Sequence, residues 1–434
     1  MAARLAHRDP GFGDDFARLL AGRREGDAQL ESDVADILRA VRDDGDDAVI
    51  EFTRRFDGLE LTPATFAISG DDMAAAEDAC PDAALAALGV AAARIEAYHL
   101  RQVPKDENIV DGAGVRLGWR WRPVAAAGVY VPGGQAAYPS SVLMNVIPAR
   151  IAGVKRIVMV VPAPNGEINP LVLAAARRAG VTEAYRIGGA QAIGALAYGT
   201  ATIAAVDKIV GPGNAWVAAA KRQVFGTVGI DMIAGPSEIL VVADGANDAD
   251  WIAVDLLAQA EHDEAAQSIL ITDDEAFADR VEAAVEARLK TLPRAAIAGA
   301  SWAAFGAVIV VDDLAEVPAL VDAVAPEHLA LAVADPESLA EKVNNAGAIF
   351  MGRFTPEAVG DYVAGANHVL PTGGTARFSS GLSVLDFVKR TSIIKCDAES
   401  LSIIGPAAVT LAQAEGLDAH ALSITMRLNL PPSG

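Results

Sequence analysis

The sequence has few cysteines, fewer basic than acidic residues, and no long uncharged apolar run. Its two cysteines, Cys80 and Cys396, lie outside any CxxC motif, so we expect no disulfide framework and a reducing compartment such as the cytoplasm. The 35 basic residues against 57 acidic ones give a net charge of −22, which argues against binding to nucleic acid or to an anionic membrane. The sequence contains no run of about 18 uncharged apolar residues, so no membrane span is predicted. Residues 1–10 lack the apolar core of a signal peptide.

The remaining composition favours a large globular chain of two or three domains. Of its 434 residues, 52% are hydrophobic and 21% charged, which is enough for a sizeable core. Residues 11–100 carry apolar side chains at helical spacing, for example Val34, Ile37 and Val41. They contain no recognisable chemistry, so we interpret them as scaffold. Residues 114–135 alternate and then become apolar, which predicts a hairpin-like segment and a short buried strand.

Short apolar strands alternate with helices over most of the chain from residue 156 onward. This alternation is typical of α/β proteins and predicts two doubly wound parallel sheets, each an incomplete Rossmann-like unit. The tail is predicted to be extended and then helical, and its residues 422–430 alternate like an edge strand. The predicted parts are a helical segment that packs on the second α/β unit (1–129), a first α/β unit (130–237), a second α/β unit (238–381) and a tail domain (382–434).

Four of the six histidines have a carboxylate or an amide close by in the sequence, and all four lie in the second half of the chain. They occur as Gln259 with His262, Glu327 with His328, Asp361 with His368, and Glu415 with His420. This recurrence predicts one assembled site rather than four unrelated histidines. The alternative, a set of separate surface or core histidines, is common for any single motif of this kind.

Residues from three of these groups suit a metal ion. Gln259 and His262 are three residues apart, so on a helix their side chains share one face and can reach one cation. Asp361 and His420 could complete a mixed nitrogen and oxygen ligand sphere, which suits zinc or a similar divalent ion. No three of these residues have a compact metal-binding spacing, so the prediction depends on the fold bringing them together.

Glu327 and His328 are predicted to carry acid/base chemistry. They follow Pro326 and precede an apolar run, which places them at the start of a strand, where both side chains can reach a cleft. A carboxylate beside an imidazole is suited to proton transfer near neutral pH.

Two glycine-rich turns, residues 187–191 and 210–214, each lead from a predicted strand into a helix. Backbone N–H groups at such a helix start favour an anion such as a pyrophosphate, and Gln191 and Asn214 add polar groups there. The turns do not match the Rossmann fingerprint, because Trp216 stands where the third glycine is required. Ordinary tight turns are the alternative. Ser237, in a Gly-Pro-Ser turn, either begins a strand or contacts a ligand.

Ten sequence blocks, in order along the chain, resemble the histidinol dehydrogenase family. The resemblance runs from about residue 20 to the end, and the set is far more specific than any one block. The blocks are 130–134 (YVPGG), 138–145 (YPSSVLMN), 188–193 (GGAQAI), 211–214 (GPGN), 231–238 (DMIAGPSE), 259–262 (QAEH), 325–329 (APEHL), 361–372 (DYVAGANHVLPT), 379–384 (SSGLSV) and 414–420 (AEGLDAH).

The resemblance implies a zinc- and NAD-dependent enzyme that oxidises L-histidinol to L-histidine through bound histidinaldehyde, the last step of histidine biosynthesis. It also implies one zinc ion per subunit and a homodimer whose exchanged tails supply Glu415 and His420 to the neighbouring subunit's site. The implied roles are acid/base catalysis for Glu327 and His328; zinc ligation for Gln259, His262, Asp361 and His420; contact with NAD for Tyr130, Gln191 and Asn214; and contact with the substrate for Ser237, His328, His368, Glu415 and the zinc ligands.

Three alternatives stay open from the sequence. A paralogue could oxidise another amino alcohol or a sulfonated diol, although a sulfonate favours Arg or Lys where this tail carries Glu415. A zinc hydrolase would not bind NAD and would tolerate changes at Gln191 and Asn214. A non-catalytic binding protein would keep its function after Glu327→Gln.

Overall fold

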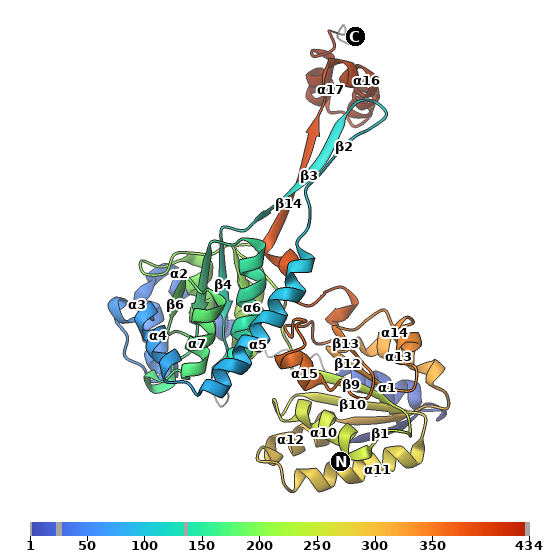
Figure 1. Ribbon diagram of the computed structural model, residues 1–434. Helices are drawn as coiled ribbons and strands as arrows, with labels where there is room; N and C mark the ends of the chain where they lie inside the picture. The colour runs from blue at the N-terminus through green and yellow to red at the C-terminus, as the bar shows by residue number, and fades with distance from the viewer. Residues whose placement is uncertain (1, 23–27, 134–137, 430–434) are drawn as a thin grey trace. The chain divides into compact units, whose positions relative to one another are not determined.

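The computed structural model describes residues 2–22, 28–133 and 138–429, and it divides into two compact units. The first unit contains the described residues of Met1–Gln102 and Ala125–Phe387, and the second those of Val103–Val124 and Val388–Gly434. Figure 1 shows two sheets with their helices in the first unit. The predicted α/β class with parallel sheets is confirmed.

The first sheet has the strand order β6-β5-β4-β7-β8, and all its pairings are parallel. The chain builds outward from β4 in one direction and then returns to add β7 on the other side, so a topological switch point lies between β4 and β7. Its strands are β4 (Ala126–Tyr130), β5 (Arg156–Val160), β6 (Glu183–Tyr185), β7 (Lys208–Val210) and β8 (Gly229–Ile230). The connecting helices are α6 (Pro139–Ala152), α7 (Pro170–Ala179), α8 (Gly189–Tyr198) and α9 (Ala215–Val224).

Four N-terminal helices pack on this first sheet's helices. They are α2 (Ala28–Asp44), α3 (Asp46–Asp57), α4 (Gly70–Asp78) and α5 (Asp82–His99). Helix α2 lies against α8 and α9, α4 against α7, and α5 against α6, and Val34 and Val41 share an apolar core with Leu196. The prediction that the N-terminal segment packs on the second α/β unit is therefore wrong for these helices, because an apolar stripe shows that a face is buried but not against which partner.

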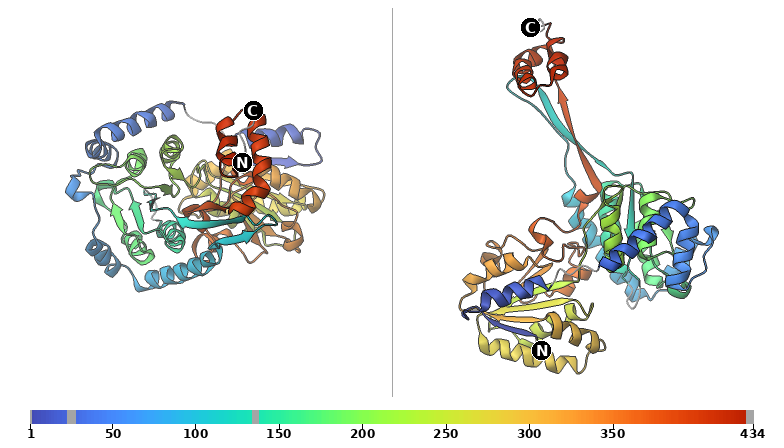
Figure 2. Two further views of the ribbon diagram at one scale, coloured as in Figure 1. Left: turned by 90° about the horizontal axis from the view of Figure 1, so that it is seen from above. Right: turned by 180° about the vertical axis from the view of Figure 1, so that it is seen from behind.

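The second sheet has the order β1-β11-β10-β9-β12-β13, again with parallel pairings only. Helices α1, α13 and α14 cover one face and α10, α11 and α12 the other (Figure 2). The strands are β1 (Ala3–Ala6), β9 (Glu238–Ala243), β10 (Gln267–Thr272), β11 (Ala307–Val310), β12 (His328–Ala332) and β13 (Ala348–Met351). The helices are α1 (Phe12–Ala21), α10 (Ala249–Ala260), α11 (Glu275–Leu289), α12 (Ala295–Phe305), α13 (Val317–Val324) and α14 (Pro336–Ala340).

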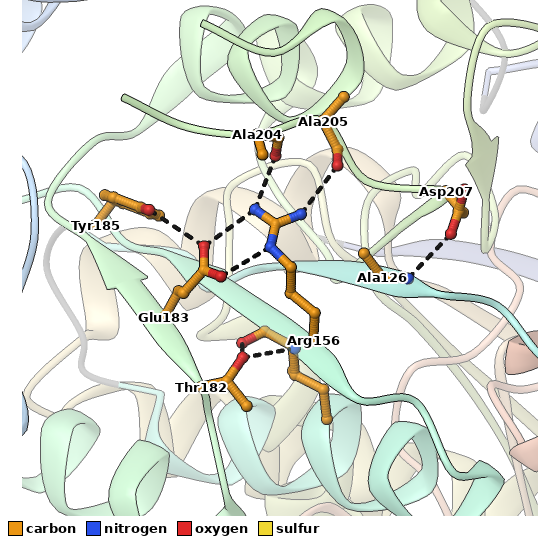
Figure 3. A network of polar contacts seen from close by, with 9 residues as sticks. Ala126, Arg156, Thr182, Glu183, Tyr185, Ala204, Ala205 and Asp207 are labelled. Atoms are coloured by element: carbon orange, nitrogen blue, oxygen red, sulfur yellow. Dashed lines mark hydrogen bonds and ion pairs between the residues drawn. The ribbon is translucent and has the colours of Figure 1, made fainter. Parts of the chain in front are cut away.

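The amino ends of the first sheet's strands are joined by polar contacts around Arg156 (Figure 3). Its guanidinium donates two hydrogen bonds to Glu183, at 2.8 and 3.0 Å, and two more to the carbonyl oxygens of Ala204 and Ala205, at 2.9 Å or less. Nearby, the Asp207 carboxylate accepts the backbone N–H of Ala126 at 3.0 Å. This end of the sheet is therefore held by charged side chains, whereas the opposite end is open for a ligand.

The second unit joins residues from two distant parts of the chain. Its antiparallel sheet has the order β14-β3-β2, formed by β14 (Val388–Lys395), β3 (Arg116–Pro123) and β2 (Glu107–Val110). Helices α16 (Ala398–Ala414) and α17 (Asp418–Thr425) pack on each other. Two predictions are corrected here. Residues 103–124 belong with the tail and not with the N-terminal helices, and residues 422–425 are helical, because α17 packs along α16; residue 430 lies outside the described residues.

Among the described residues, one helix is long and apolar enough to cross a membrane by length and composition alone. It is Asp82–Gln102, which consists of α5 and a short 3₁₀ turn (Leu100–Gln102). A single helix of this kind is weak evidence for a membrane span. It carries Arg94 and Glu96, so it is not uncharged, and α5 packs against α6 and α7.

Candidate active site

A cavity of about 400 Å³ lies at the carboxyl ends of the first sheet's strands. Its lining includes Tyr130 at the end of β4, Gln191 in α8 and Asn214 before α9, so the structure brings together the three residues predicted to contact NAD. Ligands of open α/β sheets bind at this edge, next to the switch point. The lining also includes Asp57 and Trp216, neither of which has a ligand-binding signal in the sequence.

The glycine turns let the backbone approach this cavity closely. Gly211 has φ +110°, and a Cβ there would lie 2.1 Å from the carbonyl oxygen of Tyr130, so no other residue fits. The N–H of Gly189 donates to the Tyr130 hydroxyl oxygen at 3.1 Å, and burial raises the pKa of Tyr130 to about 12. The Gln191 side-chain oxygen is buried without a hydrogen-bond partner among the described residues, which leaves it free to accept one from a ligand.

Glu327 and His328 lie at the amino end of β12, where both contact the backbone of Glu238 on the neighbouring strand β9. The N–H of Glu238 donates to the Glu327 carboxylate at 2.9 Å, and the Glu238 carbonyl oxygen lies 2.9 Å from His328 Nδ1. Because a carbonyl can only accept, Nδ1 carries the proton and Nε2 keeps its lone pair. His328 Nε2 is buried and has no hydrogen-bond partner among the described residues.

Burial shifts the pKa values of both Glu327 and His328. It raises the pKa of the Glu327 carboxyl well above its usual value, and the Glu238, Glu357 and Asp361 carboxyls add to the shift. It lowers the pKa of His328 to about 4, so the imidazole is neutral at physiological pH. A neutral imidazole with a free lone pair is the form required of a general base.

Helix α15 (Glu357–Tyr362) brings two carboxylates to the same place. Ligand atoms of His328, Glu357 and Asp361 all lie within 4.8 Å of one another. Burial raises the pKa of Asp361 to about 6 and also raises that of Glu357, to which Asp361 and Asp255 contribute. Glu357 is absent from the predicted site. Its signal was its position after Pro356, four residues before Asp361, which puts both carboxylates on one helix face.

Gln259 and His262 approach this cluster from the end of α10. Gln259 is fully buried, and neither polar atom of its amide has a hydrogen-bond partner among the described residues. His262 lies in the turn that follows the helix, and its backbone N–H donates a hydrogen bond to the Gln259 carbonyl oxygen at 3.2 Å. Burial lowers the pKa of His262. A positive charge on His262 would also lower the pKa values of His328 and His368. Because such charge effects act over short distances, the three imidazoles are neighbours.

His368 is held in place by two contacts. Its Nδ1 lies 2.9 Å from the carbonyl oxygen of Asp361, and its Nε2 lies 3.3 Å from the Ser141 hydroxyl in α6. Burial lowers the pKa of His368 to about 4.

Ser237 precedes β9, and its carbonyl oxygen accepts the N–H of Gln267 at 2.9 Å.

Glu415 and His420 belong to the second unit, where Glu415 ends α16 and His420 lies in α17. Both side chains are exposed. Of the eight residues predicted to hold substrate, six therefore lie in the first unit and two in the second.

The buried polar groups of the first unit fit a divalent cation. The Gln259 amide and one Glu357 oxygen are buried without partners among the described residues, although such groups are nearly always satisfied. The carboxylates, imidazoles and amide together form the mixed oxygen and nitrogen set that zinc accepts.

The chain is similar to histidinol dehydrogenases along its whole length. Residues 21–428 match the histidinol dehydrogenase family. The histidinol dehydrogenase of Rhodospirillum rubrum is 64% identical over 430 residues, 99% of each chain, and that of Rhizobium meliloti 61% identical over the full length of both. The crystal structure of the Elizabethkingia anophelis histidinol dehydrogenase superposes with a TM-score of 0.93 at 37% identity, over 99% of this chain and 98% of that one. The chain is therefore an oxidoreductase that belongs to the histidinol dehydrogenase family.

Proposed function

We propose that the protein oxidises L-histidinol to L-histidine in two steps, through bound L-histidinaldehyde, with two molecules of NAD and one zinc ion per subunit. Family membership supports the substrate. The observation that carries the two-step chemistry is the pair formed by neutral His328, with its free Nε2, and buried Glu327 beside it.

Gln259, His262 and Asp361 would hold the zinc ion, with His420 as the fourth ligand. The unpartnered Gln259 amide and the neutral His262 imidazole support this assignment, because only uncharged imidazole binds metal. When bound, the ion supplies a Lewis acid and an anchor for the amine and imidazole of histidinol. Burial raises the pKa of Glu357, and a cation bound beside it would stabilise its charged form.

His328 accepts the proton of the substrate hydroxyl at Nε2, and its Nδ1–H stays on the Glu238 carbonyl oxygen, which keeps the ring in one orientation. Glu327 takes a proton from water as the water oxygen adds to the aldehyde carbon, and protonated His328 returns its proton to the carbonyl oxygen, which gives a hydrate and leaves His328 neutral. The hydrate keeps the aldehyde C–H and has two hydroxyls, so His328 can accept a hydroxyl proton in the second oxidation as in the first. NAD supplies the hydride acceptor in both steps.

The remaining predicted residues hold the two ligands. Ser237 and His368 would contact the substrate from the first unit, and Glu415 would pair with its ammonium group. Tyr130, Gln191 and Asn214, which line the cavity of the first sheet, would contact NAD.

We further propose a cytoplasmic homodimer in which each tail serves the neighbouring subunit. Glu415 and His420 are exposed within their own unit, which supports a role against another surface. A zinc site that needs His420 would then be complete only in the dimer.

The test is the absorbance at 340 nm of purified protein with L-histidinol and NAD, with and without a chelator. Two NADH per histidinol, lost on chelation and restored by zinc, is the expected result. One NADH per histidinol would mean that the aldehyde escapes and that the role of Glu327 is wrong. Turnover of a different amino alcohol or a sulfonated diol, with none of histidinol, would indicate the paralogous enzyme.

A further inference from the structure

A buried ion pair lies directly beneath the glycine turn of residues 211–214. Lys221 projects from α9 and Asp231 follows β8, and their side chains are 2% and 0% exposed. The pair is distinct from every residue assigned above to catalysis, metal or ligand binding.

The pair holds both polar groups of one residue. Lys221 Nζ donates to the Gly211 carbonyl oxygen at 2.9 Å, and the Gly211 N–H donates to Asp231 Oδ2 at 2.8 Å. Lys221 Nζ also contacts Asp231 Oδ1, which accepts the N–H of Met232 at 2.6 Å. Gly211, with its positive φ, is thus fixed from both sides at the point where the chain passes over Tyr130.

A buried ion pair is an inefficient way to gain stability, because removing two charges from water costs about as much as their attraction returns. Apolar residues of similar size are often equally stable in such a position. This pair spans α9 and the end of β8 and contacts both polar groups of one glycine with positive φ, so its geometry is suited to fixing the backbone position.

The turn that it fixes ends at Asn214, which lines the proposed NAD cavity. Gly211 lies three residues before Asn214, whose side chain caps α9 by accepting the N–H of Val217 at 3.2 Å. Lys221 lies farther along that same helix, so it ties the turn to the body of α9. Asp231 begins the segment that leads to Ser237 and β9, and therefore also links the turn to the chain entering the second sheet.

We propose that Lys221 and Asp231 are positioning residues, which hold the Gly211–Asn214 turn in the conformation that binds the pyrophosphate of NAD. The inference rests on the proposed NAD role of this cavity. Bound pyrophosphate needs backbone N–H groups at fixed positions, and a turn free to shift would present them only part of the time.

The experiment replaces the pair without leaving a buried charge. In Lys221→Met/Asp231→Leu, both partners of Gly211 are lost while the packing volume is roughly kept. NAD binding is measured by isothermal titration calorimetry, without histidinol, and the unfolding midpoint by circular dichroism. We expect the dissociation constant for NAD to rise about tenfold or more, with the midpoint close to that of the parent and KM for histidinol unchanged at saturating NAD.

A second variant separates the two contacts. Lys221→Met/Asp231→Asn is also uncharged, but its amide oxygen can still accept the Gly211 N–H. We expect it to bind NAD more tightly than the apolar variant. It also secures the test should the apolar variant not fold.

The matched control is Arg156→Met/Glu183→Leu, which removes an ion pair from the same sheet at the end away from the cavity. This control should lose stability but keep its NAD affinity. NAD affinity that falls equally in the control and in the Lys221 variants, or in neither, overturns the positioning role. Absence of NAD binding by the parent protein would overturn the proposed NAD site itself, and the positioning role with it.

Discussion

Arg156→Met tests whether the polar network at the amino end of the first sheet stabilises the fold. Arg156 begins β5, and its guanidinium joins Glu183 on β6 to the carbonyl oxygens of Ala204 and Ala205 (Figure 3). Methionine preserves most of the aliphatic stem, so the variant removes mainly the four hydrogen bonds and the charge.

The expected loss follows from the partial burial of the pair. The Arg156 and Glu183 side chains are 24% and 35% exposed, so water recovers part of each lost contact. A hydrogen bond to a charged group contributes about 1.5 to 3 kcal/mol when buried, and exposed ion pairs contribute about 0 to 1 kcal/mol. We therefore expect the free energy of unfolding to fall by about 2 to 3 kcal/mol, between the sum of four buried bonds and one exposed pair.

The assay is urea unfolding followed by circular dichroism, with Arg54→Met as the control. Arg54 makes an equally bidentate contact with Glu51, at 2.7 and 3.0 Å, but on the surface of α3. That variant should be indistinguishable from the parent, because water and salt screen an exposed pair. Equal losses in the free energy of unfolding for the two variants would refute the reasoning that burial makes the Arg156 contact more stabilising than an exposed one.

The Arg156 effect should also depend on pH in one direction. The Arg156 hydrogen bonds are the main cause that lowers the pKa of Glu183 below its ordinary value of 4.5. A lowered folded-state pKa means that the stabilisation is complete above pH 4.5 and is lost as the pH falls through the folded value. The parent and Arg156→Met should therefore converge in stability in acid, and a constant difference would contradict an ionic origin.

The remaining predictions concern the site. Gln259→Leu removes two unpartnered buried polar atoms, so the metal-free protein should keep or gain stability by thermal unfolding, while zinc content by elemental analysis falls. Glu327→Gln should leave the first oxidation in place and slow hydration, so that the NADH formed per histidinol drops from two toward one. Burial holds the folded pKa values of His328 and His368 at about 4, below the ordinary value of 6.5, so the unfolded chain binds more protons than the folded one below pH 6.5. These imidazoles therefore reduce the stability of the metal-free protein as the pH falls from 6.5 to 4, whereas the raised pKa values of Glu327, Glu357 and Asp361 act in the opposite direction. The imidazole contribution is isolated by comparison with His328→Gln/His368→Gln: the stability of the parent relative to this variant should fall from pH 6.5 to pH 4, and a constant difference would contradict buried neutral imidazoles.

The local fold was predictable where a short pattern has one structural solution. Alternating strands and helices led to parallel sheets, and Pro326 followed by an apolar run led to the start of β12 at His328. Partners distant in sequence were not predictable in the same way. Arg116 on β3 pairs with Lys395 on β14, and nothing local to either strand indicates the other. Residues 103–124 were for this reason assigned to the wrong part of the chain.

The candidate site shows the same division. The sequence predicted one site for four histidines that each have a carboxylate or an amide close by, and the structure brings His262, His328 and His368 together. The fourth, His420, lies in the second unit. Glu357 was missed although Asp361 follows it four residues later, because two carboxylates with this spacing also occur on exposed helix faces. Its significance comes from burial against His328, which depends on tertiary packing. The Lys221–Asp231 contact was missed for the same reason, since a lysine in an amphipathic helix ordinarily faces solvent.

Strand β1 has a consequence for how the protein is made. Ala3 pairs with Ala307, about 300 residues later in the chain, whereas the strands of the first sheet all lie between Ala126 and Ile230. Translation adds about 5 to 20 residues per second, so roughly 15 to 60 s pass between the synthesis of β1 and that of its partner strand β11. The first sheet can thus be finished while the β1 segment is still unpaired. A fusion tag or chaperone held at residues 3–6 would delay only the second sheet, and would leave the edge of β11 open to pairing with another nascent chain.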